Sequence, residues 1–147
     1  MVGNRSTQAN ISRHFFTLEK SNDSKVKRTF MMDDVYGRAK LLSKTCLKIA
    51  LVLPAEITLC NLMRGQLIDR ATEMAIKSKG LMMTQNSDFF GKKLSEAKEA
   101  ADGCHYWLEL IHEENYLDSA IINPILAESE AISHLFAMAI RKIKPNY

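Results

Sequence analysis

Three lysines at helical spacing are the residues whose type and spacing most directly suggest a ligand. Lys40, Lys44 and Lys48 recur every four residues, so an α-helix would align them in one outward row. Ammonium groups in such a row can bind the phosphates of RNA or DNA, or they can form an ordinary solvated helix face. Arg64 and Arg70 complete the candidate nucleic-acid-binding set. Arg64 lies closer to the apolar side of its segment, whereas Arg70 has acids within one helical turn with which it can pair.

A second candidate site consists of His105, Glu109 and His112, which share one face of a helix at i, i+4 and i+7. Two imidazoles and a carboxylate can bind Zn²⁺ or a similar ion. Glu109-x-x-His112 also matches the local spacing found in four-helix di-metal proteins, but the chain has no second copy of it. These side chains flank an apolar row instead of occupying it, so we expect no metal and no cofactor.

Motifs that would indicate catalysis are missing from the sequence. It has no glycine-rich phosphate loop, no nucleophile elbow and no acid pair at core positions. We therefore expect a protein that is not an enzyme and has no catalytic residues. Leu81, Met82 and Met83 follow Gly80, where a helix is expected to end, in a loop predicted over residues 80–87. Apolar loop residues invite a protein partner, although this loop could equally fold back over its own domain.

The elements that would position these residues are four helices. Each has apolar residues spaced alternately by four and three positions, the pattern of a buried helical seam. The strongest seam runs from Phe90 to Ile111, with Ser87 or Asp88 at the N-cap position. The other members of this seam are Leu94, Ala97, Ala101, Cys104 and Leu108.

The other three seams have recognisable ends. One runs from Val35 to Leu53, with Asp33 or Asp34 as its cap and Pro54 as its stop. The next starts with Pro54 in its first turn and ends at Gly80. The last runs from Ile125 to Ile143 and is closed by Pro145, after a short break over residues 114–118. Four such seams predict an all-α, antiparallel up-down four-helix bundle.

Length and composition are consistent with this fold. The chain has 147 residues and 46% hydrophobic residues, enough for one domain with a core. We expect a flexible polar tail over residues 1–30 and a bundle domain over 31–147. No run of residues is apolar enough to cross a membrane, the N-terminus lacks the apolar region of a signal peptide, and three cysteines form no CxxC pair. These features indicate a reduced, cytoplasmic protein.

Charge is unevenly distributed along the sequence. Residues 1–30 carry a net charge of +4 and residues 31–147 carry −1. Within the bundle, residues 36–80 carry +5 and residues 81–147 carry −4. Basic and acidic halves could balance each other within one subunit or meet between subunits.

The seam residues and their neighbours resemble a known family of bacterial four-helix bundle proteins over residues 33–144. That family includes proteins encoded in intervening sequences of 23S ribosomal RNA genes and the accessory variability determinant of diversity-generating retroelements. The matching residues are Asp33-Asp34-Val35-Tyr36, Arg38-Ala39-Lys40, Leu42, Gln66-Leu67-Ile68, Asp88-Phe89-Phe90, Leu94, Glu99-Ala100-Ala101-Asp102 and Tyr106-Trp107-Leu108-Glu109-Leu110.

The resemblance implies a homo-oligomer, specifically a homopentamer, and for one branch a basic surface that binds nucleic acid and a reverse transcriptase. The family pattern on the second helix has an arginine where this chain has Asp69, and the bundle is nearly neutral, so the chain is not assigned to the retroelement branch. Two functions remain: an oligomeric bundle that binds nucleic acid or a nucleoprotein partner, and a protein-interaction scaffold with no nucleic-acid role.

Overall fold

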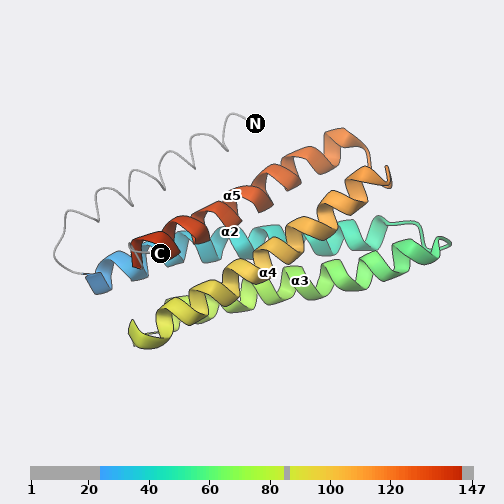
Figure 1. The fold of residues 1–147 in the computed structure, drawn as a ribbon. Coiled ribbons are helices and arrows are strands. Elements are labelled where there is room, and N and C mark those ends of the chain that lie inside the picture. The colour runs from blue at the N-terminus through green and yellow to red at the C-terminus, as the bar shows by residue number, and fades with distance from the viewer. Residues whose placement is uncertain (1–23, 85–86, 144–147) are drawn as a thin grey trace.

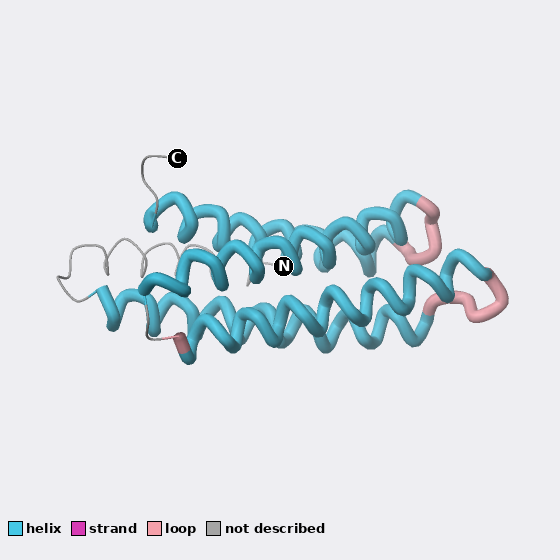
Figure 2. Tube along the Cα trace, turned by 60° about the horizontal axis from the view of Figure 1, so that its bottom comes forward, coloured by secondary structure: helices cyan, strands magenta, loops and turns pink. Residues whose placement is uncertain are grey.

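The computed structural model describes residues 24–84 and 87–143, and all regular secondary structure in these ranges is α-helical. The helices are α2 (Ser24–Val52), α3 (Thr58–Met83), α4 (Ser87–Glu113) and α5 (Ser119–Ile143). Each helix packs beside the next one along the chain and runs antiparallel to it (Figure 1). The predicted all-α, up-down four-helix bundle is confirmed. Figure 2 shows the loops over 53–57 and 114–118 at one end of the bundle, and the end of α3 and the start of α4 at the other.

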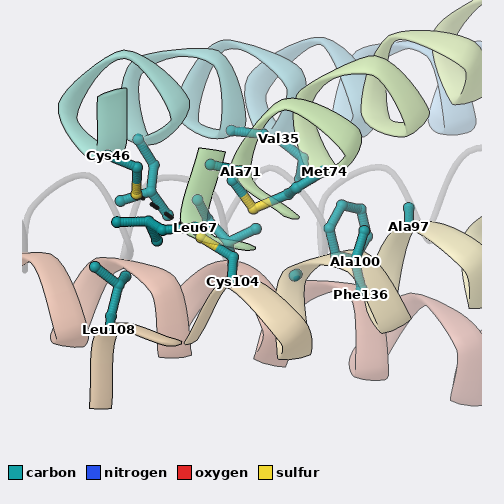
Figure 3. Packing of buried hydrophobic residues seen from close by; sticks show 14 of the residues in the cluster. Val35, Cys46, Leu67, Ala71, Met74, Ala97, Ala100, Cys104, Leu108 and Phe136 are labelled. Atoms are coloured by element: carbon teal, nitrogen blue, oxygen red, sulfur yellow. Dashed lines mark hydrogen bonds between the residues drawn. The ribbon is translucent and has the colours of Figure 1, made fainter. Parts of the chain in front are cut away.

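Most of the core comes from the apolar seams that the sequence predicts. Every residue of the seam from Phe90 to Ile111 is at most 2% exposed, and every residue of the seam from Val35 to Leu53 is at most 4% exposed. Ile143, the last residue predicted for the fourth seam, is an exception at 40% exposure. Small residues such as Ala71 and Ala97 alternate with larger ones such as Phe136, which lets facing helices interdigitate (Figure 3). Burying one leucine-sized side chain contributes roughly 1.5–3 kcal/mol, so the seams supply the main driving force for folding.

The start of α2 differs from the prediction. The helix begins at Ser24, so Asp33 and Asp34 lie within it instead of capping it. No glycine or proline occurs between Ser24 and Val35, and nothing there interrupts the helix. Residues 24–30 of the predicted tail are therefore helical, and residues 1–23 lie outside the described part of the chain.

The connection between α2 and α3 is longer than predicted. Helix α2 ends at Val52, just before Leu53 and Pro54, as expected for a residue preceding proline. However, Pro54 is not in the first turn of the next helix, because α3 begins at Thr58 after Ile57 in an extended conformation. The prediction of a helix starting at Pro54 is wrong, and residues 53–57 form a connection between two helices.

Gly80 does not end α3, which continues to Met83. Thr84 closes the helix, with its Oγ1 donating to the Gly80 carbonyl at 2.8 Å. Leu81 is buried in the core at 2% exposure, and Met82 packs against it. Glycine costs a helix only about 1 kcal/mol relative to alanine, and the burial of Leu81 offsets that cost. The predicted loop over 80–87 is thus wrong, because its first four residues are helical.

Both ends of the α4–α5 connection are well capped. Asn115 has φ 58°, and Tyr116 N–H donates to the Ile111 carbonyl at 3.2 Å, which is a Schellman ending for α4. The Asp118 side chain accepts a hydrogen bond from Ala120 N–H at 3.1 Å, so α5 begins six residues before the predicted Ile125. The break predicted over 114–118 is confirmed.

The remaining features at or near helix ends differ from the prediction or lie outside the described residues. Pro124 lies inside α5, where it removes one hydrogen bond, but fully buried Ile122 anchors the preceding turn. Ser87 is the first residue of α4, so Ser87 and Asp88 belong to its first turn instead of preceding it. The predicted stop at Pro145 lies outside the described residues.

Candidate nucleic-acid interface

The lysine row of α2 is present as predicted. Lys40, Lys44 and Lys48 are exposed, and none of them forms an ion pair with another described residue. The Lys40 ammonium lies 6.0 Å from the centroid of the Tyr36 ring. The segment 35–52 contains no Asp or Glu, so no carboxylate of α2 lies within one helical turn of these lysines. Three cations at this spacing can contact successive phosphates along a nucleic acid.

Arg64 has a structural role that the sequence did not reveal. Its Nε donates to the Ala50 carbonyl at 2.7 Å, and its Nη2 donates to the Leu53 carbonyl at 2.7 Å. Its Nη1 donates to the side chain of Asn61. The last carbonyls of a helix have no partners within the helix, so this guanidinium caps the C-terminus of α2. Arg64 is therefore occupied by the fold and is not a free phosphate-binding group.

Arg70 is also engaged within the bundle. Its Nη1 lies 3.1 Å from Glu73 Oε2, the i, i+3 pairing that the sequence suggested as an alternative. The aliphatic part of Arg70 passes close to the backbone of Gly103, where a Cβ atom would be 3.0 Å from Arg70 Cδ. Both arginines are therefore engaged by other groups of the bundle, whereas the three lysines are not paired with acids among the described residues. The candidate interface is reduced to the three lysines of α2.

The predicted partner-binding residues of α3 do not form one surface. Leu81 belongs to the core, Met82 is half-buried, and only Met83 is largely exposed, at 73%. A helix places consecutive residues about 100° apart, so three neighbours cannot share one exposed face. Apolar side chains are also exposed on α2, on the same outer side of the helix as the lysine row; they are Leu41, Leu47, Leu51 and Val52.

His105 links α4 to α5 through a contact with Ser129. Its Nδ1 is 2.5 Å from Ser129 Oγ, and its Nε2 is 3.2 Å from Glu109 Oε1. Ser129 Oγ also donates to the Leu126 carbonyl at 2.9 Å. Nδ1 of His112 is buried without a hydrogen-bond partner among the described residues. That part of the chain contains no cluster of three or more His, Cys, Asp or Glu side chains placed to hold a metal.

The order Glu109, His105, Ser129 resembles an acid–histidine–serine array, but its geometry does not suit nucleophilic attack. Ser129 is 0% exposed, and its hydroxyl hydrogen is directed to a helix carbonyl. A serine nucleophile must be accessible to substrate and must give its proton to the histidine. In this conformation the array therefore fixes α4 to α5 and does not present a reactive hydroxyl.

Arg38 is a further functional-looking residue that sequence reasoning missed. Its Nε and Nη2 donate to Glu128 Oε1 and Oε2 at 2.7 and 2.8 Å, a bidentate pair between α2 and α5. Both side chains are mostly buried, at 11% and 20% exposure. Helices α2 and α5 pack less extensively than the other neighbouring pairs, so this ion pair is an important part of their contact. The 90-residue separation left no local signal in the sequence.

The three cysteines are buried and free. Cys46 Sγ lies 3.8 Å from Cys104 Sγ across the core. The hydrogen bond to Cys104 and burial raise the pKa of Cys46 well above its usual range. Burial also raises the pKa of Cys60, despite the opposing charge of Arg64. A thiol whose pKa is raised is rarely ionised and is a poor nucleophile, so these residues serve as core side chains.

Comparison with known proteins identifies a similar fold. One solved structure, described as a protein with unknown function from the S23 ribosomal protein family of Bacteroides thetaiotaomicron VPI-5482, superposes with a TM-score of 0.66 and 21% sequence identity. The match covers 73% of this chain and 98% of the other. It shows a shared fold. No family model and no curated protein matches the chain. In the described ranges, none of the helices combines the length and apolar character needed to cross a membrane.

Proposed function

We propose that the protein is a non-enzymatic, homo-oligomeric four-helix bundle of the cytoplasm that binds RNA or DNA, directly or together with a nucleoprotein partner such as a reverse transcriptase. The supporting observation is the lysine row of α2, in which Lys40, Lys44 and Lys48 are exposed and not paired with acids. The free, buried cysteines suit a reducing compartment. The fold shared with an S23-family protein is compatible with this role.

The proposal predicts binding that weakens with salt. Each lysine that neutralises a phosphate of duplex DNA contributes about −0.9 to the slope of log affinity against log salt concentration. Replacing Lys40, Lys44 and Lys48 together by alanine should therefore make the slope about 2–3 less negative. Lys98→Ala is a matched control, because Lys98 is paired with Asp102 at 2.6 Å. Fluorescence anisotropy with a labelled duplex measures both variants, and unchanged binding by the triple variant would contradict the proposal.

A second candidate function is a protein-interaction scaffold, and the apolar surface of α2 favours it. Leu41, Leu51 and Val52 are all at least 66% exposed on a helix of the bundle. Apolar side chains clustered on one helix typically cover a partner. That partner is a second copy of this chain in the oligomer or another protein, and the resemblance to the pentameric family favours the former.

Light scattering coupled to size-exclusion chromatography tests the oligomer. We expect a mass near five times the 16.7 kDa of one chain. Leu51→Asp should reduce that mass, since a carboxylate cannot be buried without a partner. Ile76→Asp on α3 is a comparable exposed position and serves as the control. A monomeric wild type would exclude the oligomer, and co-purification of a protein without nucleic acid would favour the scaffold.

A further inference from the structure

Three side-chain contacts, given at the end of this paragraph, establish which residues of neighbouring antiparallel helices lie at the same level along the bundle. Each helix rises 1.5 Å per residue, so equal numbers of residues counted from a contact along both helices reach the same level. Lys93 of α4 therefore lies level with Arg141 of α5 and with the last turn of α3. The first two turns of α2 lie at this level as well (Figure 2). The contacts are those of Lys77 with Glu96, His105 with Ser129, and Arg38 with Glu128.

This level is the basic end of the bundle, a name used here for residues 89–94 of α4 and the last eight residues of α3 and α5. These residues include six Lys or Arg and no acid. At the opposite end, the first eight residues of α3 and α5, the last eight of α4 and the two loops contribute five acids and one arginine. Charge is thus divided between the ends of the bundle and not only between its first and second halves. The six basic residues are Lys77, Lys79, Lys92, Lys93, Arg141 and Lys142.

An aromatic ring is exposed within this basic end. Phe89 is 59% exposed in the first turn of α4, and Lys92 and Lys93 follow it at i+3 and i+4 on the same side of the helix. Both lysines are exposed, as are Lys79 and Arg141 on the adjoining helices. Phe90, the next residue, is buried in the core, so the core does not require a ring at Phe89.

We propose that the basic end is a binding surface for single-stranded nucleic acid in which the Phe89 ring stacks on an unpaired base while Lys92 and Lys93 contact the flanking phosphates. The proposal rests on the proposed function for its ligand class but uses different residues from the lysine row of α2. Single-strand binders combine a positive surface with exposed rings, because every unpaired base presents a face for stacking. A duplex offers phosphates to the lysines but no free base face to the ring.

The structure favours this ligand over other anionic surfaces. The opposite end of a second copy, where the acids lie, would supply carboxylates to the lysines, and an anionic vesicle would supply phosphates. Neither requires a planar ring, so Phe89→Leu should preserve binding to them. Binding to a single strand should be weakened by this same change, which separates the three ligands.

The experiment measures the affinity of the full-length protein for a fluorescein-labelled 20-nucleotide oligo(dT) by anisotropy. Phe89→Leu and Phe89→Ala should weaken binding about tenfold, whereas affinity for a duplex of equal length should change less than twofold. Lys92→Ala with Lys93→Ala should make the salt slope for the single strand about 1.4 less negative. Tyr106→Ala is the matched control, since Tyr106 is 52% exposed on the same helix, about 25 Å away.

The outcomes separate this inference from the proposed function. If the Phe89 variants bind oligo(dT) as tightly as the wild type, the stacking surface is refuted, even if the lysine row of α2 proves to bind duplex. If the Phe89 variants lose oligo(dT) binding but the triple alanine variant of Lys40, Lys44 and Lys48 binds duplex as tightly as the wild type, this inference stands and the proposed site on α2 fails. Wild-type protein that binds vesicles or its own copies but no oligo(dT) would also overturn the inference.

Discussion

Replacing Arg64 by alanine tests whether this residue is a helix cap or a ligand-binding group. The change removes two hydrogen bonds of 2.7 Å to the carbonyls of Ala50 and Leu53 at the end of α2. A hydrogen bond from a charged donor contributes about 1.5–3 kcal/mol to stability. Both bonds are only partly buried, so water can replace some of what is lost. We expect the free energy of unfolding to fall by about 2 kcal/mol.

Urea denaturation followed by far-ultraviolet circular dichroism measures this change. With a slope of roughly 1–3 kcal/mol per molar urea, a loss of about 2 kcal/mol lowers the midpoint by about 1 M. Arg64→Lys should recover little, because one ammonium group cannot reproduce the fork that reaches both carbonyls. The lysine row of α2 is not altered, so nucleic-acid affinity should change less than twofold.

Arg70→Ala is the matched control. It removes a partly exposed i, i+3 pair with Glu73, which typically contributes no more than about 0.5 kcal/mol. If Arg64→Ala were no more destabilising than Arg70→Ala, the capping role would be refuted. If Arg64→Ala instead lost nucleic-acid binding while its stability was unchanged, Arg64 would belong to the nucleic-acid interface.

Three further changes test the core and the helices. Arg38→Met leaves Glu128 without its partner and should cost about 2 kcal/mol by urea denaturation, with part of the loss recovered when Glu128→Leu is added. Gly65→Ala should raise the melting temperature by about 2–4 °C in a thermal scan, since nothing lies within 4 Å of the new methyl group, whereas Gly103→Ala should not. The raised pKa of Cys46 means that the folded chain keeps a proton that the unfolded chain loses above its ordinary pKa of 9.0. Unfolding free energy should therefore fall as pH rises above about 9, and Cys46→Ala should lessen that fall; an unchanged slope would contradict the assignment.

Helices with strong seams were predictable because burial dominates their energetics. The alternation of four and three residues from Phe90 to Ile111 is explained most simply by a buried helical seam, and every residue of this seam is buried in the structure. Boundaries were less predictable, because Gly80 and Pro124 carry local costs of about 1–3 kcal/mol that tertiary packing outweighs. A sequence shows those costs but does not show the burial of Leu81 or Ile122 that offsets them.

The candidate site was predictable only where it depends on one helix. The row of Lys40, Lys44 and Lys48 needs nothing but helical periodicity. The capping role of Arg64 was not predictable, because the carbonyls that it caps belong to another helix. The basic end was not predictable either, because its charges come from three helices whose relative levels are established only by contacts between them.

The weak packing between α2 and α5 has a consequence for how the chain folds. The other helix contacts join neighbours separated by short loops, so they form at little cost in loop-closure entropy. The α2–α5 contact joins residues 90 apart in sequence, yet it is the least extensive of the four. A transition state built from adjacent hairpins can therefore form before the bundle closes. Helical bundles dominated by contacts between helices adjacent in sequence typically fold in microseconds to milliseconds.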